Sequence, residues 1–388
     1  MPHVQRACPV CTCAQVDVVF NNAMAAVGGF DMSYTIGRCQ QCGFHFAHVL
    51  ADDATFQNYY RSVSKYDVAG HISALDQVRI EAAAQFCDAH VPKHHMVVDL
   101  GCGFGAMLSQ FKIAGWTNLH GVDPAPNSAE RAHTLFGLAN IHCATMEQAH
   151  TVVSLGDADL VCVMAVLEHL PNLRADMTAL LARLRPGCKI LVEVPAVEYF
   201  SNLHNEPFGE FSLEHIQFFT ATSLKNLFRS LGASPIAIHM QDLPMIHSGS
   251  VFGLFQLAPE LGSGEPLEPE RDTTLEAYVA ASRATLDLAL QGIPAQPLII
   301  YGAGSHTARL IPLLEQMPGI SIAAVVDSNP NLQGKPIGTQ ASTWTIEAPG
   351  WIEQRPELPV LVSSFRSQRE IASSLQGRYP NPLVLLYP

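Results

Sequence analysis

The sequence predicts an α/β protein of several domains, whose central part folds around a mostly parallel sheet. Between about residue 70 and residue 258, short apolar runs typical of strands alternate with stretches of helical periodicity. A second, smaller alternation follows a connector rich in Gly, Pro and Glu at 260–270. Because 388 residues exceed what one core of ordinary size holds, we expect three domains at 1–70, 71–258 and 259–388.

The central part contains seven candidate strands. The first five are separated by helical stretches and the last two lie close together, as in a parallel sheet that ends in a hairpin. They are MVVDL (96–100), LHGVD (119–123), NIHCA (140–144), ADLVCVM (158–164), KILVEVP (189–195), IAIHM (236–240) and VFGLFQL (251–257). This order fits the sheet of a class I methyltransferase. A long apolar-periodic helix at 274–290 leads into the second series, which predicts a separate, substrate-binding Rossmann-like domain.

Composition and charge argue against two classes of partner. The chain has 22 Lys and Arg against 35 Asp and Glu, a net charge of −13, so it lacks the basic surface that binding to a phosphate backbone demands. No apolar run approaches the roughly 20 residues of a membrane span, and the N-terminus lacks the charged-then-apolar pattern of a signal peptide. We therefore expect a cytoplasmic protein with a small-molecule substrate, and neither nucleic acid nor membrane as a partner.

Four of the ten cysteines form two C-x-x-C pairs, CPVC (Cys8, Cys11) and CQQC (Cys39, Cys42). Each pair offers two thiolates, and four thiolates make a closed tetrahedral site for zinc. A compact domain this small also needs such a link, because its core alone is too small to be stable. A redox dithiol is the alternative, although it favours one C-x-x-C at the start of a helix. We predict a structural zinc ion at these four residues.

The stretch VVDLGCGFGAML joins the first central strand to a helix and has the spacing D-x-G-x-G-x-G. Glycines allow a tight turn and let a ligand lie against bare backbone, while the helix N-terminus offers amide donors. A dinucleotide fingerprint reads G-x-G-x-x-G instead, so the spacing favours S-adenosylmethionine (SAM), which has no phosphate to bind. A turn that serves packing alone is the other interpretation. The predicted SAM-binding residues in this loop are Asp99, Gly101, Gly103 and Gly105.

Three further strand ends supply candidate residues for the SAM pocket. Asp123 closes the second strand, where a carboxylate would accept both ribose hydroxyls. Met146 and Glu147 follow the third strand, where residues that face the adenine are expected. After the fourth strand, MAVLEHLPN brings Glu168 and His169, which would cover the SAM pocket or orient a substrate; helix capping is the equal alternative. This place lacks the N-P-P-Y-like tetrad of enzymes that methylate nucleobase amines.

Together these features resemble the three-domain C-methyltransferases of deoxysugar tailoring, in which a four-cysteine zinc module precedes a SAM domain and a Rossmann-like tail. The similarity spans nearly the whole chain and rests on CPVC with CQQC, DLGCGFG, EH followed by FF, and YGAG with VDSNP. That family methylates C3 of a nucleotide-linked 4-keto sugar. The resemblance implies that His215 in GEFSLEHIQFFT is the general base, that Glu214 assists it, and that the loop 302–306 helps to hold the sugar nucleotide.

The chain departs from that family at two positions. Ser212 stands where a Tyr precedes the Glu, and His306 stands where a Lys lies in the C-terminal glycine loop. In that family, the Tyr and the Lys would touch the sugar or its diphosphate. The resemblance therefore supports the methyl transfer more strongly than it supports the sugar substrate. The C-terminal loop contains only G-x-G, which is a weak signal for nucleotide binding. The alternative is a Rossmann-like fold that packs against the rest of the protein without binding a nucleotide.

Methylation of a carbon would explain why a histidine lies in the apolar run around residue 215. The alternative is that His215 is a core residue without a catalytic role. A carbon beside a ketone is methylated only after its proton is removed, and histidine has a pKa suited to that step near neutral pH. Glu214 would orient the imidazole, although neighbouring residues on a strand point to opposite faces. Tyr66 is expected to cover SAM or to donate to the enolate, with core packing as the alternative. Two rival functions are O- or N-methylation of a small metabolite with His215 as base, and a non-catalytic SAM-binding adaptor.

Overall fold

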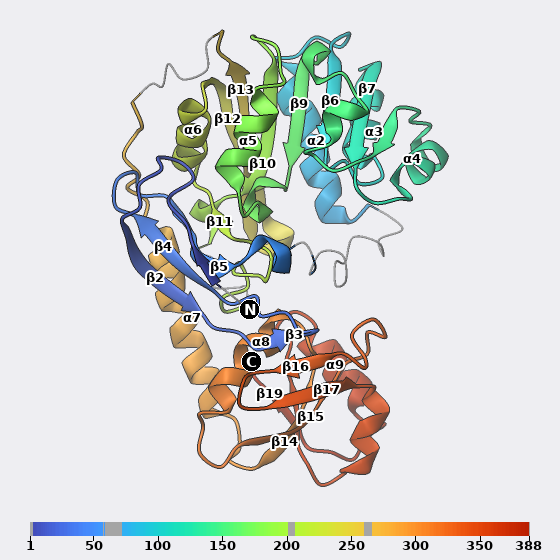
Figure 1. Ribbon diagram of the computed structural model, residues 1–388. Coiled ribbons are helices and arrows are strands. Elements are labelled where there is room, and N and C mark those ends of the chain that lie inside the picture. Colours follow the sequence, from blue (N-terminus) through green and yellow to red (C-terminus); the bar gives the residue numbers. More distant parts are fainter. Residues whose placement is uncertain (1–2, 57, 59–71, 201–205, 260–265, 388) are drawn as a thin grey trace.

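The computed structural model describes residues 3–56, 58, 72–200, 206–259 and 266–387. They form three sheets that follow one another along the molecule (Figure 1). The sheet of the central part lies at one end, the sheet of the N-terminal segment in the middle, and the sheet of the C-terminal part at the other end. Tyr66 falls outside the described residues, so its predicted role stays a prediction.

The central sheet has the strand order β12-β13-β10-β9-β6-β7-β8. Its members are β6 (Met96–Leu100), β7 (Asn118–Asp123), β8 (Ile141–Cys143), β9 (Leu160–Met164), β10 (Lys189–Pro195), β12 (Ala233–Leu243) and β13 (Ser248–Leu257). The first five pair in parallel, whereas β13 runs antiparallel to both β10 and β12. The predicted parallel sheet with a terminal hairpin is therefore confirmed, and the expected strands differ from the observed ones only at their ends.

Helices cover both faces of this sheet, which explains why its central strands β6, β9 and β10 are apolar along most of their length. Val97 of β6 shares a core with α2 and α3, and the next residue, Val98, shares one with α5 and α6, because successive side chains on a strand point to opposite faces. The helices are α2 (Ala74–Asp88), α3 (Ala106–Ile113), α4 (Ser128–Phe136), α5 (Leu173–Leu181) and α6 (Ala221–Ser230). The loops after β6, β7, β8 and β9 consequently meet at the carboxyl edge of the sheet, where ligands bind in open α/β folds.

The N-terminal segment shares its core with both neighbours. Its sheet has the order β1-β5-β4-β2 and includes β11 (Gln217–Phe218) of the central part, which pairs with β5. Its own strands are β1 (His3–Gln5), β2 (Val16–Asn22), β4 (Tyr34–Cys39) and β5 (His45–Ala51). Cys8 and Phe46 pack with the central sheet, while Phe20 and Tyr34 pack with the C-terminal part. This sheet therefore joins the two larger parts.

The C-terminal part is reached through α7 (Thr274–Gln291), which runs along one side of the molecule (Figure 1). Its sheet has the order β19-β18-β14-β15-β17-β16-β3. The members are β14 (Pro297–Tyr301), β15 (Ser321–Val326), β16 (Pro336–Gly338), β17 (Thr343–Glu347), β18 (Val360–Val362), β19 (Leu383–Leu385) and β3 (Ala26–Val27), with helices α8 (Ser305–Leu314) and α9 (Gln368–Leu375). β14 pairs in parallel with β15 and β18, as in the βαβ series that the sequence predicts. The sequence did not predict β3, which adds an N-terminal strand to this sheet.

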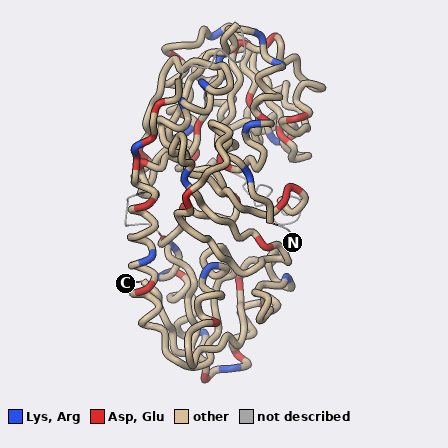
Figure 2. The backbone as a smooth tube through the Cα atoms, turned by 60° about the vertical axis from the view of Figure 1, so that its left-hand side comes forward, with Lys and Arg blue, Asp and Glu red and all other residues tan. Residues whose placement is uncertain are grey.

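Within the described residues, no helix has both the length and the apolar character of a membrane span. Lys and Arg are interspersed with Asp and Glu over both halves of the molecule (Figure 2). Buried charged side chains include Asp99, Glu168, Glu193 and Arg309. Because a charge inside a protein is costly unless it is paired, these residues mark buried ion pairs or candidate functional sites.

Candidate active site

The predicted glycine loop lies at the carboxyl edge of the central sheet, directly after β6. Gly101, Gly103 and Gly105 have φ angles of +81°, +53° and +82°, a left-handed region that favours glycine. A Cβ atom on Gly101 would approach Cγ2 of Val166 to 3.0 Å, whereas the space beside Gly103 is open. α3 begins directly after Gly105, so bare backbone and the first amides of a helix lie at the same edge. The loop can therefore receive a ligand against its backbone.

Two carboxylates flank this loop. Asp99 is 2% exposed, and burial together with the charge of Asp123 raises its pKa to about 8. Its Oδ1 atom accepts no hydrogen bond from the described residues. Asp123 accepts from the amides of Gly103 (2.7 Å) and Ala125 (2.9 Å) and from the hydroxyl of Ser128 (3.0 Å). A carboxylate has about four acceptor positions, so Asp123 keeps one of them, where the sequence predicts that it accepts two ribose hydroxyls.

The loop after β8 carries the two residues expected near the adenine. Met146 is half-buried and packs against the central core, whereas Glu147 is exposed. The carbonyl of Glu147 accepts a hydrogen bond from Nδ1 of His150 (3.0 Å). This loop ends at the same sheet edge as the glycine loop, and the adenine contacts predicted for Met146 and Glu147 stay a prediction.

An acid–base cluster of one buried and two partly buried side chains follows β9 at this edge. It consists of Glu168 and His169 in the 3₁₀ helix η3 (Leu167–His169) and of His215, and one side-chain atom from each lies within 4.8 Å of the others. The rings of His169 and His215 meet edge to face with centroids 4.9 Å apart. The amide of Ile216 donates to the carbonyl of Glu168 (2.9 Å) and so holds the two segments together. The fold thereby brings His215 to the loops that would hold SAM.

The hydrogen bonds of His169 define its protonation. Its Nδ1 atom lies 3.1 Å from the carbonyl oxygen of Glu214, which can only accept, so Nδ1 carries the proton and Nε2 the lone pair. Nε2 lies 3.8 Å from Oε1 of Glu168. Burial and the charge of Glu193 raise the pKa of Glu168 to about 8, so this carboxyl is mostly protonated at neutral pH. A protonated carboxyl group and an imidazole lone pair therefore face each other.

His215 is a weaker base in this structure than the sequence predicts. Burial, the neighbouring His169 and the positive charge of Arg79 lower its pKa to about 3, whereas the sequence predicts a value near neutral pH. The imidazole is consequently neutral at physiological pH and has a lone pair that can accept a proton. A negative charge formed beside it would raise its pKa, so its strength as a base depends on what is bound.

The turn before His215 is fixed by Ser212. Its Oγ accepts hydrogen bonds from the amides of Glu214 (3.2 Å) and His215 (3.0 Å), and the hydroxyl of Tyr34 donates to its carbonyl (2.9 Å). A serine at this position thus closes a local turn. Glu214 interacts with His169 as well: burial lowers the pKa of His169, and the charge of Glu214 and the hydrogen bond to its backbone oppose that effect. Glu214 thus acts on His169, and its predicted orientation of His215 stays a prediction.

Sequence reasoning missed an ion pair next to the cluster. Glu193 in β10 is fully buried, and Arg79 in α2 binds both of its carboxylate oxygens, with Nε 3.0 Å from Oε1. The signal in the sequence was the single Glu within the apolar strand KILVEVP. Because Arg79 already brings a positive charge to Glu168 and His215, the cluster is better suited to move protons than to hold a metal ion.

The four predicted metal ligands meet at one point. The Sγ atoms of Cys8 and Cys42 are 3.6 Å apart, those of Cys11 and Cys39 are 3.4 Å apart, and all four lie within 4.8 Å of one another. Zinc held by four thiolates at about 2.3 Å places their sulfur atoms about 3.8 Å apart. The group therefore fits a tetrahedral zinc ion, and its four thiolates would leave no open position for catalysis. Cys13 does not belong to the group.

A Cys39→Ala variant is expected to lose its bound metal and to unfold at a lower temperature, because three thiolates close a tetrahedral site incompletely. Elemental analysis should find about one zinc per wild-type chain and much less in the variant. Cys13→Ala is the matched control and should behave as wild type. A full zinc content in Cys39→Ala would contradict the assignment.

In the loop 302–306 of the C-terminal part, the side chain of His306 is directed into the protein and hydrogen-bonded there. His306 is buried, and its ring nitrogens lie 2.9 Å from Oγ of Ser363 and 2.7 Å from the hydroxyl of Tyr387. Burial and the charge of Arg309 lower its pKa to about 3, so it is neutral at physiological pH. The position that carries Lys in the resembled family is thus filled by an uncharged side chain with both nitrogens engaged, which offers no positive charge to a diphosphate.

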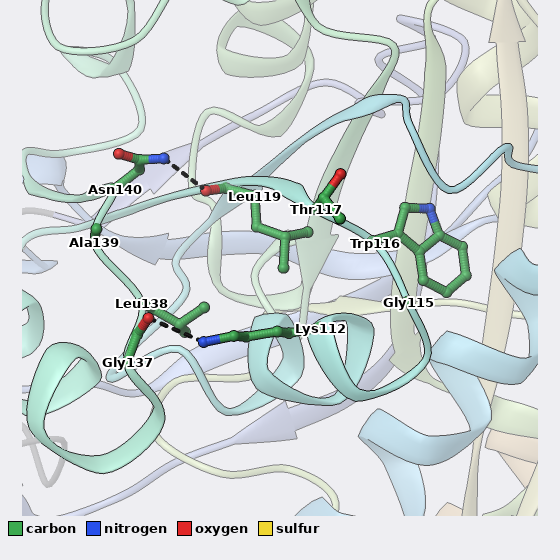
Figure 3. Close-up of a pocket in the computed structure, with 9 residues that line it drawn as sticks. All are labelled: Lys112, Gly115, Trp116, Thr117, Leu119, Gly137, Leu138, Ala139 and Asn140. Carbon is green, nitrogen blue, oxygen red and sulfur yellow. Dashed lines mark hydrogen bonds between the residues drawn. The ribbon is translucent and has the colours of Figure 1, made fainter.

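A surface pocket lies at the opposite edge of the central sheet (Figure 3). It is formed by the end of α3, the start of β7 and the residues before β8: Lys112, Gly115, Trp116, Thr117, Leu119, Gly137, Leu138, Ala139 and Asn140. Nζ of Lys112 donates to the carbonyl of Gly137 (3.0 Å), and Nδ2 of Asn140 donates to that of Leu119 (3.4 Å). Because the glycine loop and the acid–base cluster lie at the carboxyl edge, this pocket is separate from the candidate active site.

Residues 75–238 match the family model described as a methyltransferase domain. These residues form a methyltransferase domain. The match includes the glycine loop, Asp123 and the acid–base cluster, while the four-cysteine group and the C-terminal part lie outside it. The strand order of the methyltransferase domain, with its antiparallel terminal hairpin, is the class I arrangement that the sequence predicts. None of the curated proteins matches the chain.

Solved structures similar to the chain include several methyltransferases. The 1,6-didemethyltoxoflavin N1-methyltransferase of Burkholderia thailandensis is 17% identical over 61% of this chain and 100% of its own, with a TM-score of 0.43. The magnesium protoporphyrin IX methyltransferase of Synechocystis PCC 6803 is 14% identical over 53% of this chain and 100% of its own (TM-score 0.41). An N-methyltransferase of Bradyrhizobium japonicum WM9 is 16% identical over 54% and 100% (TM-score 0.38). At such low identities these similarities say nothing about the substrate of this chain.

Proposed function

We propose that the protein is a SAM-dependent methyltransferase that methylates a small molecule at a carbon next to a ketone, with His215 as the base. The observation that carries this proposal is a neutral histidine, flanked by Glu168 and His169, at the same edge as the glycine loop of the methyltransferase domain. SAM supplies an electrophilic methyl group on a sulfonium. The acid–base cluster supplies what carbon methylation needs in addition, a group that removes a proton from the substrate.

The proposed reaction begins at the lone pair of His215. The imidazole takes the proton from the substrate carbon, and the electron pair of that C–H bond forms an enolate. The enolate carbon would accept the methyl group as the S–CH3 bond breaks, and the sulfur would keep that bond's electron pair and leave as S-adenosylhomocysteine. The negative enolate raises the pKa of the imidazole beside it, while the positive charge of Arg79 and the proton of Glu168 stabilise the enolate. Phe218 and Phe219, three and four residues after His215, are buried and would limit the access of water to this region.

The glycine loop suits SAM in three respects. Its bare backbone at Gly101 and Gly103 allows close approach of a ligand. Oδ1 of the buried Asp99 lacks a donor among the described residues. The ammonium group of SAM would donate to it, and its positive charge would lower the raised pKa of Asp99. Asp123 keeps one acceptor position for a ribose hydroxyl.

Gly101→Val and Asp123→Ala are each expected to weaken the binding of S-adenosylhomocysteine (SAH) by roughly ten- to a hundredfold. The valine side chain would meet Val166 and require a strained φ, and the alanine would remove the ribose acceptor and release the amide of Gly103. Titration calorimetry measures both affinities. Gly334→Val, at a left-handed glycine of the C-terminal part with open space beside it, is the control for backbone strain. Wild-type affinity in both test variants would place the cofactor elsewhere.

Mass spectrometry of products formed from methyl-labelled SAM tests the function itself. The protein is incubated in D₂O with a panel of keto metabolites, which includes nucleotide-linked keto sugars and keto compounds without a nucleotide, because the neutral His306 leaves the need for a diphosphate open. Carbon methylation with solvent deuterium at the same carbon of unreacted substrate is the expected result. A methyl group on oxygen or nitrogen, without exchange at carbon, would replace this proposal by its alternative.

A further inference from the structure

Arg6 connects three segments around the acid–base cluster. It follows β1 and precedes Cys8 by two residues. Its Nε donates to the carbonyl of Ala47 in β5 (2.7 Å), its Nη1 to the carbonyl of Pro171 (2.6 Å), and its Nη2 to the carbonyl of Ile216 (3.1 Å). One side chain of the N-terminal segment is therefore bonded at once to its own sheet and to two separate segments of the methyltransferase domain.

Two of these carbonyls belong to the segments that carry the candidate catalytic histidines. Pro171 follows His169 by two residues, and Ile216 follows His215 directly. The donors of a guanidinium diverge in a rigid plane, so a single arginine that binds both carbonyls fixes the spacing between the segments. The guanidinium of an arginine stays charged at neutral pH. Hydrogen bonds from such a charged donor are about twice as strong as those between neutral groups.

The same arginine is anchored beside the four-cysteine group. Cys8 supplies the first thiolate of that group two residues after Arg6. Beyond Cys8, Nη1 of Arg174 in α5 donates to the carbonyls of Pro9 (3.2 Å) and Val10 (2.9 Å), which ties the same turn to the methyltransferase domain. A metal ion bound by the four cysteines would fix Cys8 relative to the end of β4. It would thereby fix the backbone from which the side chain of Arg6 extends.

We propose that Arg6 is a positioning residue, through which the four-cysteine metal group sets the spacing between His169 and His215. The inference rests on the proposed function in taking His215 as the working base. It gives the metal group a task beyond stability: without the metal, the carbonyls of Pro171 and Ile216 lose their common donor and water reaches the cluster.

The test follows the charge state of His215 and requires no methyl transfer. The ionisable groups around this residue are His169, Glu168, Glu214, Arg79 and Glu193. Burial is the largest cause of its lowered pKa of about 3, so in wild-type protein its ¹⁵N NMR signals should stay those of a neutral imidazole from pH 7 down to pH 4. In Arg6→Ala the cluster is hydrated, and the pKa should rise by about one unit or more toward the ordinary value of about 6.5. Comparison with His215→Gln assigns the signals.

Three further variants complete the experiment. Arg6→Lys keeps the charge but cannot reach all three carbonyls, so it should show a smaller rise with full metal content; it decides the matter if Arg6→Ala does not fold. Cys39→Ala, with Arg6 intact, should reproduce the rise seen in Arg6→Ala. Arg355→Ala, which removes an exposed arginine of the C-terminal part, should leave the signals unchanged.

The proposal fails if the folded Arg6 variants keep a neutral His215 down to pH 4. A neutral His215 in Cys39→Ala would break the link to the metal group even if Arg6 itself mattered. Because the signals are recorded without substrate, these outcomes are independent of whether the protein transfers a methyl group to carbon, to another atom, or not at all.

Discussion

Replacing His215 by Gln is expected to reduce methyl transfer by roughly 100- to 10,000-fold, the usual contribution of a positioned general base. Gln keeps the approximate size of the imidazole and a hydrogen-bonding atom, but it cannot take the substrate proton. The glycine loop and the four-cysteine group involve other side chains, so SAH affinity and metal content should keep their wild-type values. The loss should therefore be confined to the chemical step.

Single-turnover rates and melting temperatures, measured on the same preparation, separate this role from a packing role. A core histidine replaced by Gln would lower the melting temperature and leave the rate of the folded protein nearly normal. Glu214→Gln should have a milder effect than His215→Gln. It keeps the backbone carbonyl that accepts the hydrogen bond from His169, and the charge that it removes acts on His169, so it would affect the base only indirectly. A normal rate in His215→Gln would refute the mechanism.

The glycine loop, the seven-stranded sheet and the cysteine pairs could be predicted because each is a local pattern. The run MVVDLGCGFG contains, within a few residues, both a buried strand and the turn that needs left-handed backbone at Gly101. The two C-x-x-C pairs are local patterns too: in each, two cysteines close together in the sequence supply two metal ligands. In these cases the residues of a motif lie close together in the sequence, so the backbone or metal-binding requirement that shapes the motif can be recognised there.

The surroundings of His215 could not be predicted, because they come from residues far apart in the chain. His169 and His215 meet through a hydrogen bond between Ile216 and Glu168, and Arg6 reaches both segments from the N-terminal sheet. No period or spacing encodes such contacts. The low pKa of His215 follows from them, since burial and the nearby charge depend on the assembled fold. The strands β3 and β11 have only two residues each and carry no periodic signal.

The buried ion pair between Arg79 and Glu193 is expected to have the largest effect on stability when only one partner is removed. Glu193 is 0% exposed and has both oxygens bound by Arg79. Arg79→Met would leave a carboxylate without a partner in the interior, which should lower the free energy of unfolding by roughly 3–5 kcal/mol. Removing both charges in Arg79→Met/Glu193→Leu replaces the pair by apolar side chains and should recover most of that loss.

Chemical denaturation of the two variants and of wild-type protein measures this difference, followed by tryptophan fluorescence, to which the buried Trp116 contributes from the methyltransferase domain. Arg355→Met is the matched control: its partner Glu357 is largely exposed, and loss of such a surface pair should leave the free energy of unfolding nearly unchanged. If Arg79→Met were as stable as the double variant, Glu193 would not be a charge that depends on Arg79. The burial of Glu193 beside Glu168 and His215 would then need an explanation other than its ion pair with Arg79. The positive charge of Arg79, which lowers the pKa of the proposed base His215, would need another explanation as well.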